Sequence, residues 1–171
     1  SFLKKKNLIH FSGALKTKLA FSMHPFRPLS EKKLSLSDYQ KIPFIINGKK
    51  SFIKNLLPKF KNPFIEIPRN KKNTYHALCV MGANFPVILW NKTFNDLNTK
   101  FNIPKKDIFE YFRASLANFI DNPNNALTGP LQRNDKTTIT ANLKSLKNDP
   151  FKNVYAAFKK AYENGEENEN K

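Results

Sequence analysis

The feature that most constrains the fold is a long, mostly apolar segment over residues 74–100. Its apolar residues occupy nearly every side of a helix, and a helix that is apolar all round is buried on all sides. We therefore expect this segment in a bundle core or a subunit interface. Pro86 lies inside the segment, and it predicts a kink near Gly82 and Ala83.

The part before this helix reads as short strands separated by loops. The candidate strands cover residues 8–12, 19–23, 44–47 and 64–67, and residues 49–57 suit a crossover helix that ends at Pro58. Apolar strands joined through a helix predict a parallel or mixed sheet that is buried on both faces. The five glycines form no Gly-x-Gly-x-x-Gly turn. The first 70 residues therefore resemble the tail of a Rossmann-type sheet.

Helical patterns dominate the rest of the chain. Three further helices are predicted over residues 105–120, from Asp135 or Lys136 to 146, and 151–162. The predicted fold class is thus an α/β remnant followed by an all-α helical bundle domain. The predicted boundaries are 1–70 for the α/β part, 71–163 for the helical part and 164–171 for a frayed tail. Because the chain opens close to its first predicted strand, we expect it to be a fragment of a longer protein.

Composition limits the classes of function. The net charge is +17, but only four of the 30 basic residues are Arg, the usual reader of phosphates and guanine edges. The many Lys, Asn, Ile and Phe residues are typical of an AT-rich genome, so nucleic-acid binding is not favoured. No apolar run approaches the length of a membrane span. The single Cys79 excludes a disulfide framework and a Cys-based zinc site, which favours a reducing cytoplasm.

Polar residues on the long helix are the strongest candidates for a site. Lys72, His76, Val80 and Asn84 recur every four residues and share one face. Buried polar groups without partners are costly, so a Lys, a His and an Asn on an apolar helix require an explanation. The functional interpretation makes them catalytic. The structural interpretation makes His76 a satisfied core histidine, Asn84 a cap at the kink, and Lys72 an exposed residue before the helix.

Ser12, Gly13 and His24 follow the first two predicted strands. Ligands of open α/β sheets bind beyond the carboxyl ends of the strands, so these residues are candidates for substrate binding. The alternative is that Ser-Gly and His-Pro form ordinary turns at strand ends.

Thr128 and Arg133 are two further candidates for substrate binding. Thr128 precedes Gly129 and Pro130 in a rigid turn, and Arg133 has the charge to hold an anion or carboxylate. Asp135 is expected to cap the next helix. A surface loop followed by a helix cap explains the same residues. With three His residues and no metal-ligand or nucleophile motif, the sequence predicts no metal site.

An ordered set of motifs resembles a family of bacterial oxidoreductases. The chain carries His10, Ser12, Gly13 and Ala14; then Ser22, Met23, His24 and Pro25; then Tyr75, His76 and Ala77; then Ala83 and Asn84; then Ala126 to Pro130; then Arg133 and Asp135. In the family it resembles, a Rossmann-like domain precedes a helical domain of unknown function. The wider relatives are ketopantoate reductase, pyrroline-5-carboxylate reductase and 6-phosphogluconate dehydrogenase.

This resemblance implies a cofactor, a partner and roles for the helix residues. NAD or NADP is expected to bind a Gly-rich site before Ser1, and the helical domain is expected to form a homodimer. In the wider relatives the long helix presents Lys and Asn to the substrate. Lys72 lies before the expected start of the helix, so His76 is the better candidate for the acid or base.

Three functions follow from the sequence. The first is the substrate-binding and dimerisation part of an NAD(P)-dependent oxidoreductase that acts on a small carbonyl or imine compound, with the chain inactive alone. The second is a non-catalytic, dimeric ligand-binding module. The third is a basic nucleic-acid binder. The polar residues on the long helix favour the first two.

Overall fold

The computed structural model describes residues 7–29 and 31–169, and its chain divides into two compact units, residues 1–95 and 96–171. The unit boundary falls inside a helix. The domain boundary that the sequence predicts near residue 70 stays a prediction.

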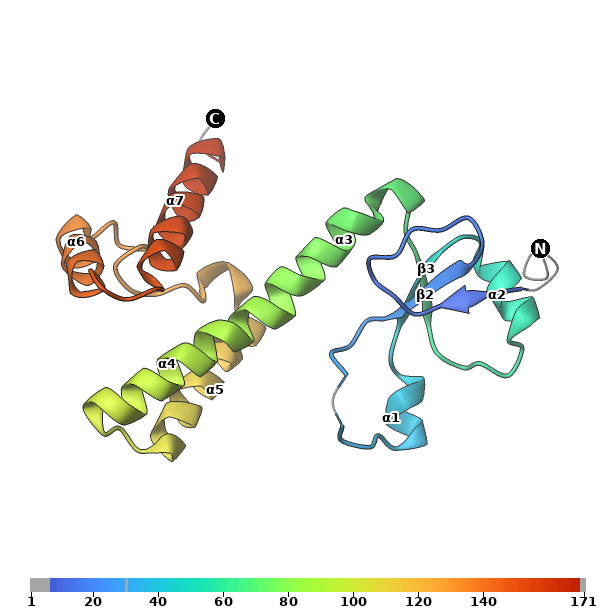
Figure 1. Cartoon of the computed structure of the whole chain (residues 1–171), viewed down its shortest axis with the longest axis horizontal. Helices are drawn as coiled ribbons and strands as arrows, with labels where there is room; N and C mark the ends of the chain where they lie inside the picture. The colour runs from blue at the N-terminus through green and yellow to red at the C-terminus, as the bar shows by residue number, and fades with distance from the viewer. Residues whose placement is uncertain (1–6, 30, 170–171) are drawn as a thin grey trace. The chain divides into compact units, whose positions relative to one another are not determined.

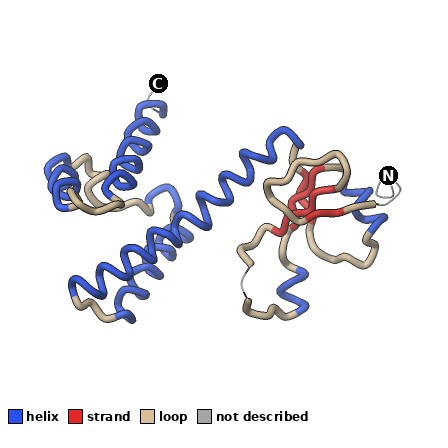
Figure 2. The backbone as a smooth tube through the Cα atoms, viewed as in Figure 1, coloured by secondary structure: helices blue, strands red, loops and turns tan. Residues whose placement is uncertain are grey.

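The first unit is built on a four-stranded mixed sheet (Figure 2). Its strands are β1 (Ile9–His10), β2 (Phe21–Pro25), β3 (Phe44–Asn47) and β4 (Phe64–Glu66), in that spatial order. β1 runs parallel to β2 and β3 runs parallel to β4, whereas β2 and β3 are antiparallel. The carboxyl ends of β1 and β2 therefore lie at one edge of the sheet, and those of β3 and β4 lie at the opposite edge.

The first two strands differ from their predicted bounds. β1 is shorter than predicted, and β2 is displaced by two residues toward the carboxyl end of the chain. Pro25, which read as a turn residue, is the last residue of β2 and is paired with Phe44. Proline is tolerated at such a position because a strand end does not need its missing N–H. As a result Ser22 and His24 lie inside β2 and do not follow it.

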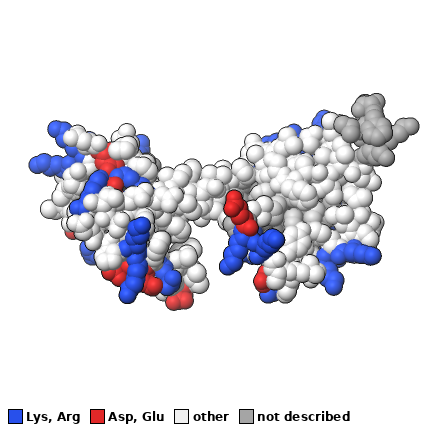
Figure 3. All heavy atoms as spheres, turned by 60° about the horizontal axis from the view of Figure 1, so that its bottom comes forward, with Lys and Arg blue, Asp and Glu red and all other residues white. Residues whose placement is uncertain are grey.

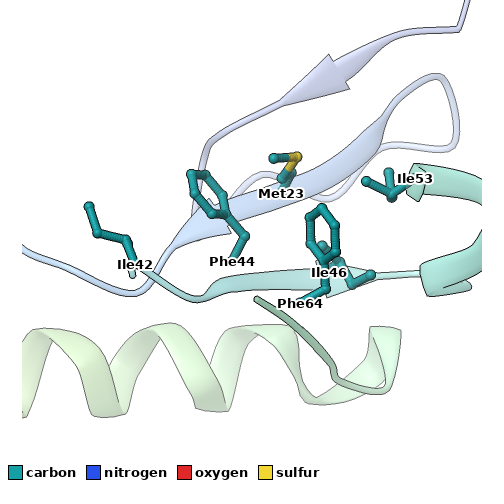
Figure 4. Close-up of a cluster of buried hydrophobic side chains, with 6 residues drawn as sticks. All are labelled: Met23, Ile42, Phe44, Ile46, Ile53 and Phe64. Atoms are coloured by element: carbon teal, nitrogen blue, oxygen red, sulfur yellow. The ribbon is translucent and has the colours of Figure 1, made fainter. Parts of the chain in front are cut away.

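The alternation of side chains along β2 and β3 separates a core face from a second face. Met23 faces the core, where it packs with Phe44 and Ile46 of β3 and with Ile53 of α2 (Lys50–Leu56). Figure 4 shows this cluster, in which Ile42 and Phe64 complete the set. Ser22 and His24 alternate with Met23, so they point to the opposite face of the sheet.

A short helix, α1 (Leu36–Gln40), lies between β2 and β3 and was not expected from the sequence. Ser35 caps its amino end by accepting a hydrogen bond from the Asp38 N–H at 3.0 Å, and its hydroxyl donates to the Asp38 carboxylate at 2.7 Å. The side chain of Ser35 thus satisfies one of the free N–H groups at the start of the helix. The spacing Ser-x-x-Asp at residues 35–38 is a sequence signal for the start of a helix and could have predicted α1.

The long helical segment, drawn as one continuous ribbon through α3 and α4 in Figure 1, is longer than predicted and is not uniform. A 3₁₀ turn (Arg69–Lys71) leads into α3 (Lys72–Cys79), a π-helical turn (Val80–Asn84) follows, and α4 (Phe85–Phe101) continues the helix. In the π turn the Phe85 N–H donates to the Val80 carbonyl, five residues earlier. The irregularity expected from Pro86 thus takes the form of a π turn that includes Gly82 and Ala83.

The prediction of a fully buried helix is wrong for the single chain. No residue of α4 is buried, and the large apolar side chains of Val87, Ile88 and Trp90 are 47%, 52% and 38% exposed. A core formed by this chain alone does not cover these positions, because such a core would remove them from water. The subunit-interface interpretation stays a prediction.

The described part of the second unit beyond α4 consists of helices. They are α5 (Lys105–Asp121), a 3₁₀ turn (Pro123–Asn125), α6 (Lys136–Ser145) and α7 (Lys152–Glu169). Ile108 of α5 and Ile139 of α6 are its buried apolar residues among those described. α7 continues past the end predicted at Tyr162, through Glu169. Residues 170–171, the end of the predicted frayed tail, lie outside the described residues.

Basic side chains occupy several separate places on the face drawn in Figure 3, consistent with their spread along the sequence. Within the described ranges, no helix combines the length and apolarity that crossing a membrane requires. The same ranges contain no group of three or more His, Cys, Asp or Glu residues placed to hold a metal ion.

Candidate active site

One face of α3 and the second face of the sheet bring the candidate residues of the first unit together. Lys72, Tyr75 and His76 occupy positions i, i+3 and i+4 of α3, which lie on one side of a helix. Ser22 and His24 alternate with the core residue Met23 along β2. Side-chain contacts between these two sets define the site.

His24 is held by Tyr75. Its Nδ1 lies 2.8 Å from the Tyr75 hydroxyl, and the two rings meet edge to face at 5.7 Å. Burial, followed by the charges of His76 and Lys72, lowers the pKa of His24. Burial, with a further effect from Cys79, raises the pKa of Tyr75. Both shifts favour a neutral imidazole and a neutral phenol, which are joined by this hydrogen bond.

Gly13 is the meeting point of the two histidines. A Cβ built on this buried glycine would lie 3.0 Å from His24 Nε2 and 2.3 Å from His76 Cδ2. The centroids of the His24 and His76 imidazole rings are 6.2 Å apart, and these rings also meet edge to face. The loop after β1 therefore needs a residue without a side chain at this point, since any other would displace the imidazole of His76. The structure thus places Gly13, His24 and His76 next to one another, while their predicted roles in binding and catalysis stay predictions.

Lys72 is buried, with only 2% of its surface exposed. The structural interpretation that placed it outside the helix and in solvent is wrong, because it is the first residue of α3. Its Nζ donates to the Ser22 hydroxyl at 2.7 Å and to the Leu15 carbonyl. Burial, then the charges of Arg69 and Lys16, lowers its pKa. These contacts tie the loop after β1 to β2, and the catalytic role of Lys72 stays a prediction.

Ser12 and Asn84 are both exposed. The Ser12 hydroxyl accepts hydrogen bonds from the N–H groups of Ala14 at 3.3 Å and Leu15 at 3.0 Å, so it shapes the turn that contains Gly13. Asn84 is the last residue of the π turn, two helical turns beyond His76. The roles predicted for them in binding or catalysis stay predictions.

Thr128 and Arg133 belong to the second unit and are exposed. The turn between them is shaped by Gly129, whose φ of +98° is a conformation that favours glycine. Asp135 caps α6 as predicted, accepting the Thr138 N–H at 2.9 Å. The structure thus brings together Gly13, His24 and His76 in the first unit, and their relation to the second unit stays a prediction.

Sequence reasoning did not assign a role to Tyr75. A signal was present, because Tyr75 precedes His76 and falls three residues after Lys72, on the same helical face. Its phenol orients His24 and leaves the Nε2 side of that ring toward Gly13 and His76. The arrangement can place one imidazole N–H in a fixed direction and a second imidazole beside it for proton transfer.

Comparison with known proteins gives a family and a fold. The sequence profile of the family described as a domain of unknown function, DUF2520, matches residues 42–162. Comparison with curated proteins finds no match.

Two solved structures share the fold. One, from Bacteroides fragilis, is described as a candidate NADP oxidoreductase; it is 20% identical, with a TM-score of 0.71 over 90% of this chain and 63% of that protein. The other, protein TM1727 from Thermotoga maritima, is 22% identical, with a TM-score of 0.72 over 96% of this chain and 70% of that protein. The chain thus spans about two thirds of each structure that it resembles.

Proposed function

The chain belongs to the DUF2520 family, and we propose that it forms the substrate-binding and dimerisation part of an NAD(P)-dependent oxidoreductase. The observation that carries this proposal is the convergence of His24 and His76 on Gly13, with Tyr75 hydrogen-bonded to His24. A small carbonyl or imine compound is the proposed substrate class. The description of the structure from Bacteroides fragilis supports the choice of cofactor.

The residues of this chain supply binding and proton transfer. The sequence holds no Gly-x-Gly-x-x-Gly turn, so we assign no dinucleotide-binding residues to it. When bound, the nicotinamide supplies or accepts the hydride. His24, oriented by Tyr75, points its Nε2–H toward the reacting oxygen or nitrogen. His76 gives that atom its proton in reduction and removes it in oxidation, and Asn84 is proposed as a further hydrogen-bond partner.

The test uses the full product of the gene that encodes this chain. NADPH oxidation is followed at 340 nm on a panel of small carbonyl and imine compounds, first for the wild type. We expect His76→Ala to lower kcat by about 10²- to 10⁴-fold, the usual contribution of a general acid or base. The free energy of unfolding is measured alongside. Equal loss of activity and folding would contradict the catalytic role and support a core histidine.

Tyr75→Phe separates orientation from proton transfer. The ring is retained, but the hydroxyl 2.8 Å from His24 Nδ1 is lost, so the imidazole tautomer is no longer fixed. We expect a lower kcat and a displaced pH profile with the fold intact. Binding of NADPH and metabolites without turnover, in every variant and in the wild type, would instead favour the non-catalytic ligand-binding module.

We also propose a homodimer, formed through the apolar surface of α4. Val87, Ile88 and Trp90 are exposed in the single chain, and exposed apolar patches of this kind mark interaction sites. A second copy of the same chain is the simplest partner, because closed twofold dimers are the commonest oligomers. Light scattering after size exclusion should give twice the chain mass for the wild type and one chain mass for Ile88→Glu. Ile65→Glu, at a similarly exposed isoleucine on β4, should remain dimeric.

A further inference from the structure

Two adjoining cavities lie at the sheet edge where β3 and β4 end, opposite the edge that carries His24 and Gly13. The larger has a volume of about 750 Å³ and the smaller about 10 Å³. They share Ala20, Asn47 and Arg69 in their walls, so we name them together the double cavity. The residues proposed for proton transfer, His24 and His76, line neither cavity.

The larger cavity has a basic rim and an apolar wall. Lys18, Lys49 and Arg69 contribute three positive charges to its lining, whereas Glu66 contributes one negative charge. Glu66 already accepts the Lys50 N–H at 2.6 Å. The excess of positive charge in a concave site attracts anions, since low-dielectric walls focus the field.

Leu19 and Phe21 belong to the apolar lining of the larger cavity. Leu19 is 62% exposed, so its apolar side chain in the cavity lining is open to solvent. The Phe21 ring is fixed by stacking on Phe52, with centroids 4.0 Å apart. A volume near 750 Å³ is in the range of small-molecule sites. An organic group that covers Leu19 and Phe21 would remove apolar surface from water.

Two polar side chains that line the smaller cavity lack a partner among the described residues: Lys72 lacks a counter-charge, and His10 Nδ1 lacks a hydrogen-bond partner. Lys72 is 2% exposed, and both of its acceptors, on Ser22 and Leu15, are neutral. No carboxylate of residues 7–29 or 31–169 lies within 4.0 Å of its Nζ. His10 has a buried Nδ1 without a hydrogen-bond partner. A buried charge normally has a counter-charge, because its desolvation is otherwise uncompensated.

We infer that the larger cavity binds a phosphate monoester with an aromatic or apolar body, its phosphate at Arg69, in the wall that the two cavities share, and its body on Leu19 and Phe21. A phosphate monoester brings close to two negative charges and three strong acceptor oxygens. Lys18 and Lys49 at the rim increase the attraction, and Lys72, in the smaller cavity behind that shared wall, feels the charge of the bound phosphate. Nucleotides and sugar phosphates share this phosphate chemistry, and the aromatic wall favours nucleotides.

The experiment measures binding to the full gene product by calorimetry, without any turnover, and the charge reversals described next separate the larger cavity from the proposed NAD(P) site, which also takes adenine nucleotides. AMP, adenosine, glucose 6-phosphate and inorganic phosphate are titrated at low and at ~200 mM salt. We expect AMP to bind most tightly, both other phosphates to bind more weakly, and adenosine to bind least. Affinity for AMP should fall at the higher salt, because ions screen the attraction.

Matched charge reversals locate the site. Lys49→Glu at the cavity rim should weaken AMP binding by about tenfold or more, the effect of losing one charge-assisted contact. Lys54→Glu makes the same change on an exposed residue of α2 that does not line the cavity, and it should leave the affinity unchanged. Both lysines are exposed, so neither variant should disturb folding.

A second measurement reports on Lys72 itself. Its pKa is followed through the ¹³Cε chemical shift with and without AMP. A bound anion favours the charged form, so AMP should raise the pKa of Lys72. Three results would each overturn the inference: equal affinity for AMP and adenosine, equal weakening by Lys49→Glu and Lys54→Glu, or no change at Lys72 when AMP is saturating.

Discussion

Substitution of Gly13 by alanine tests the packing of the candidate active site. The new Cβ would lie 2.3 Å from Cδ2 of His76 and 3.0 Å from Nε2 of His24, and real Cβ contacts essentially never fall below 3.0 Å. The closest atom belongs to a rigid imidazole ring, not to the far end of a flexible chain. The loop, the ring of His76, or both must therefore move.

The expected cost follows from two opposing effects. Gly13 is not among the glycines with positive φ, so alanine can adopt its backbone conformation. Restricting the unfolded chain then favours alanine by about 0.4–1 kcal/mol. Overpacking in a filled site costs about 1–3 kcal/mol. The clash is the larger effect, and we expect Gly13→Ala to lower the free energy of unfolding by about 1–2 kcal/mol.

Urea denaturation measures this change, with Gly82→Ala as the matched control. A Cβ on Gly82, in the π turn, meets nothing within 4 Å, so that variant should be as stable as the wild type or more stable. In a His76→Ala background the cost of Gly13→Ala should shrink, because the clashing ring is gone. A Gly13→Ala variant as stable as the wild type would refute the packing of His76 on Gly13.

Two further predictions concern pH and the core. Burial, His76 and Lys72 hold the pKa of His24 below its ordinary value of 6.5, so the unfolded chain binds more protons below that value. The free energy of unfolding should therefore fall as the pH drops from about 6.5 toward the folded pKa, and His24→Asn should make this fall shallower in urea titrations. Ile53→Ala, at a residue 1% exposed, should cost about 2–5 kcal/mol. Ile65→Ala, at a residue 47% exposed, should change stability by less than about 0.5 kcal/mol in the same assay.

The sequence predicted the mixed sheet because it depends on local patterns, whereas the contact of Gly13 with His24 and His76 joins distant parts of the chain and is seen only in the structure. Apolar runs mark strands, and polar residues after them mark the edge at which strands end. The bounds of β2 were missed because Pro25 was interpreted as a turn, although a strand end tolerates proline.

Burial was harder to predict than secondary structure. Lys72 read as exposed because it precedes the apolar run, yet Ser22 and Leu15 give it buried acceptors. Those acceptors come from about 50 residues earlier in the chain, and no local pattern contains them. Conversely, Val87 and Ile88 read as buried because they are apolar, and the single chain leaves them exposed.

The π turn at Val80–Asn84 sets the angular relation between two parts of one helix. Each residue of an α-helix advances the side-chain direction by about 100°. The wider turn accommodates one residue more than a regular turn, so α4 keeps nearly the same side-chain directions that a regular helix without Gly82 would give it. Deleting Gly82 would therefore leave the side chains around Ile88 on nearly the side that they occupy now, whereas deleting a residue from a regular turn would rotate them by about 100°. The π turn thus lets the helix carry an additional residue between His76 and Ile88 without changing the side on which its apolar surface lies.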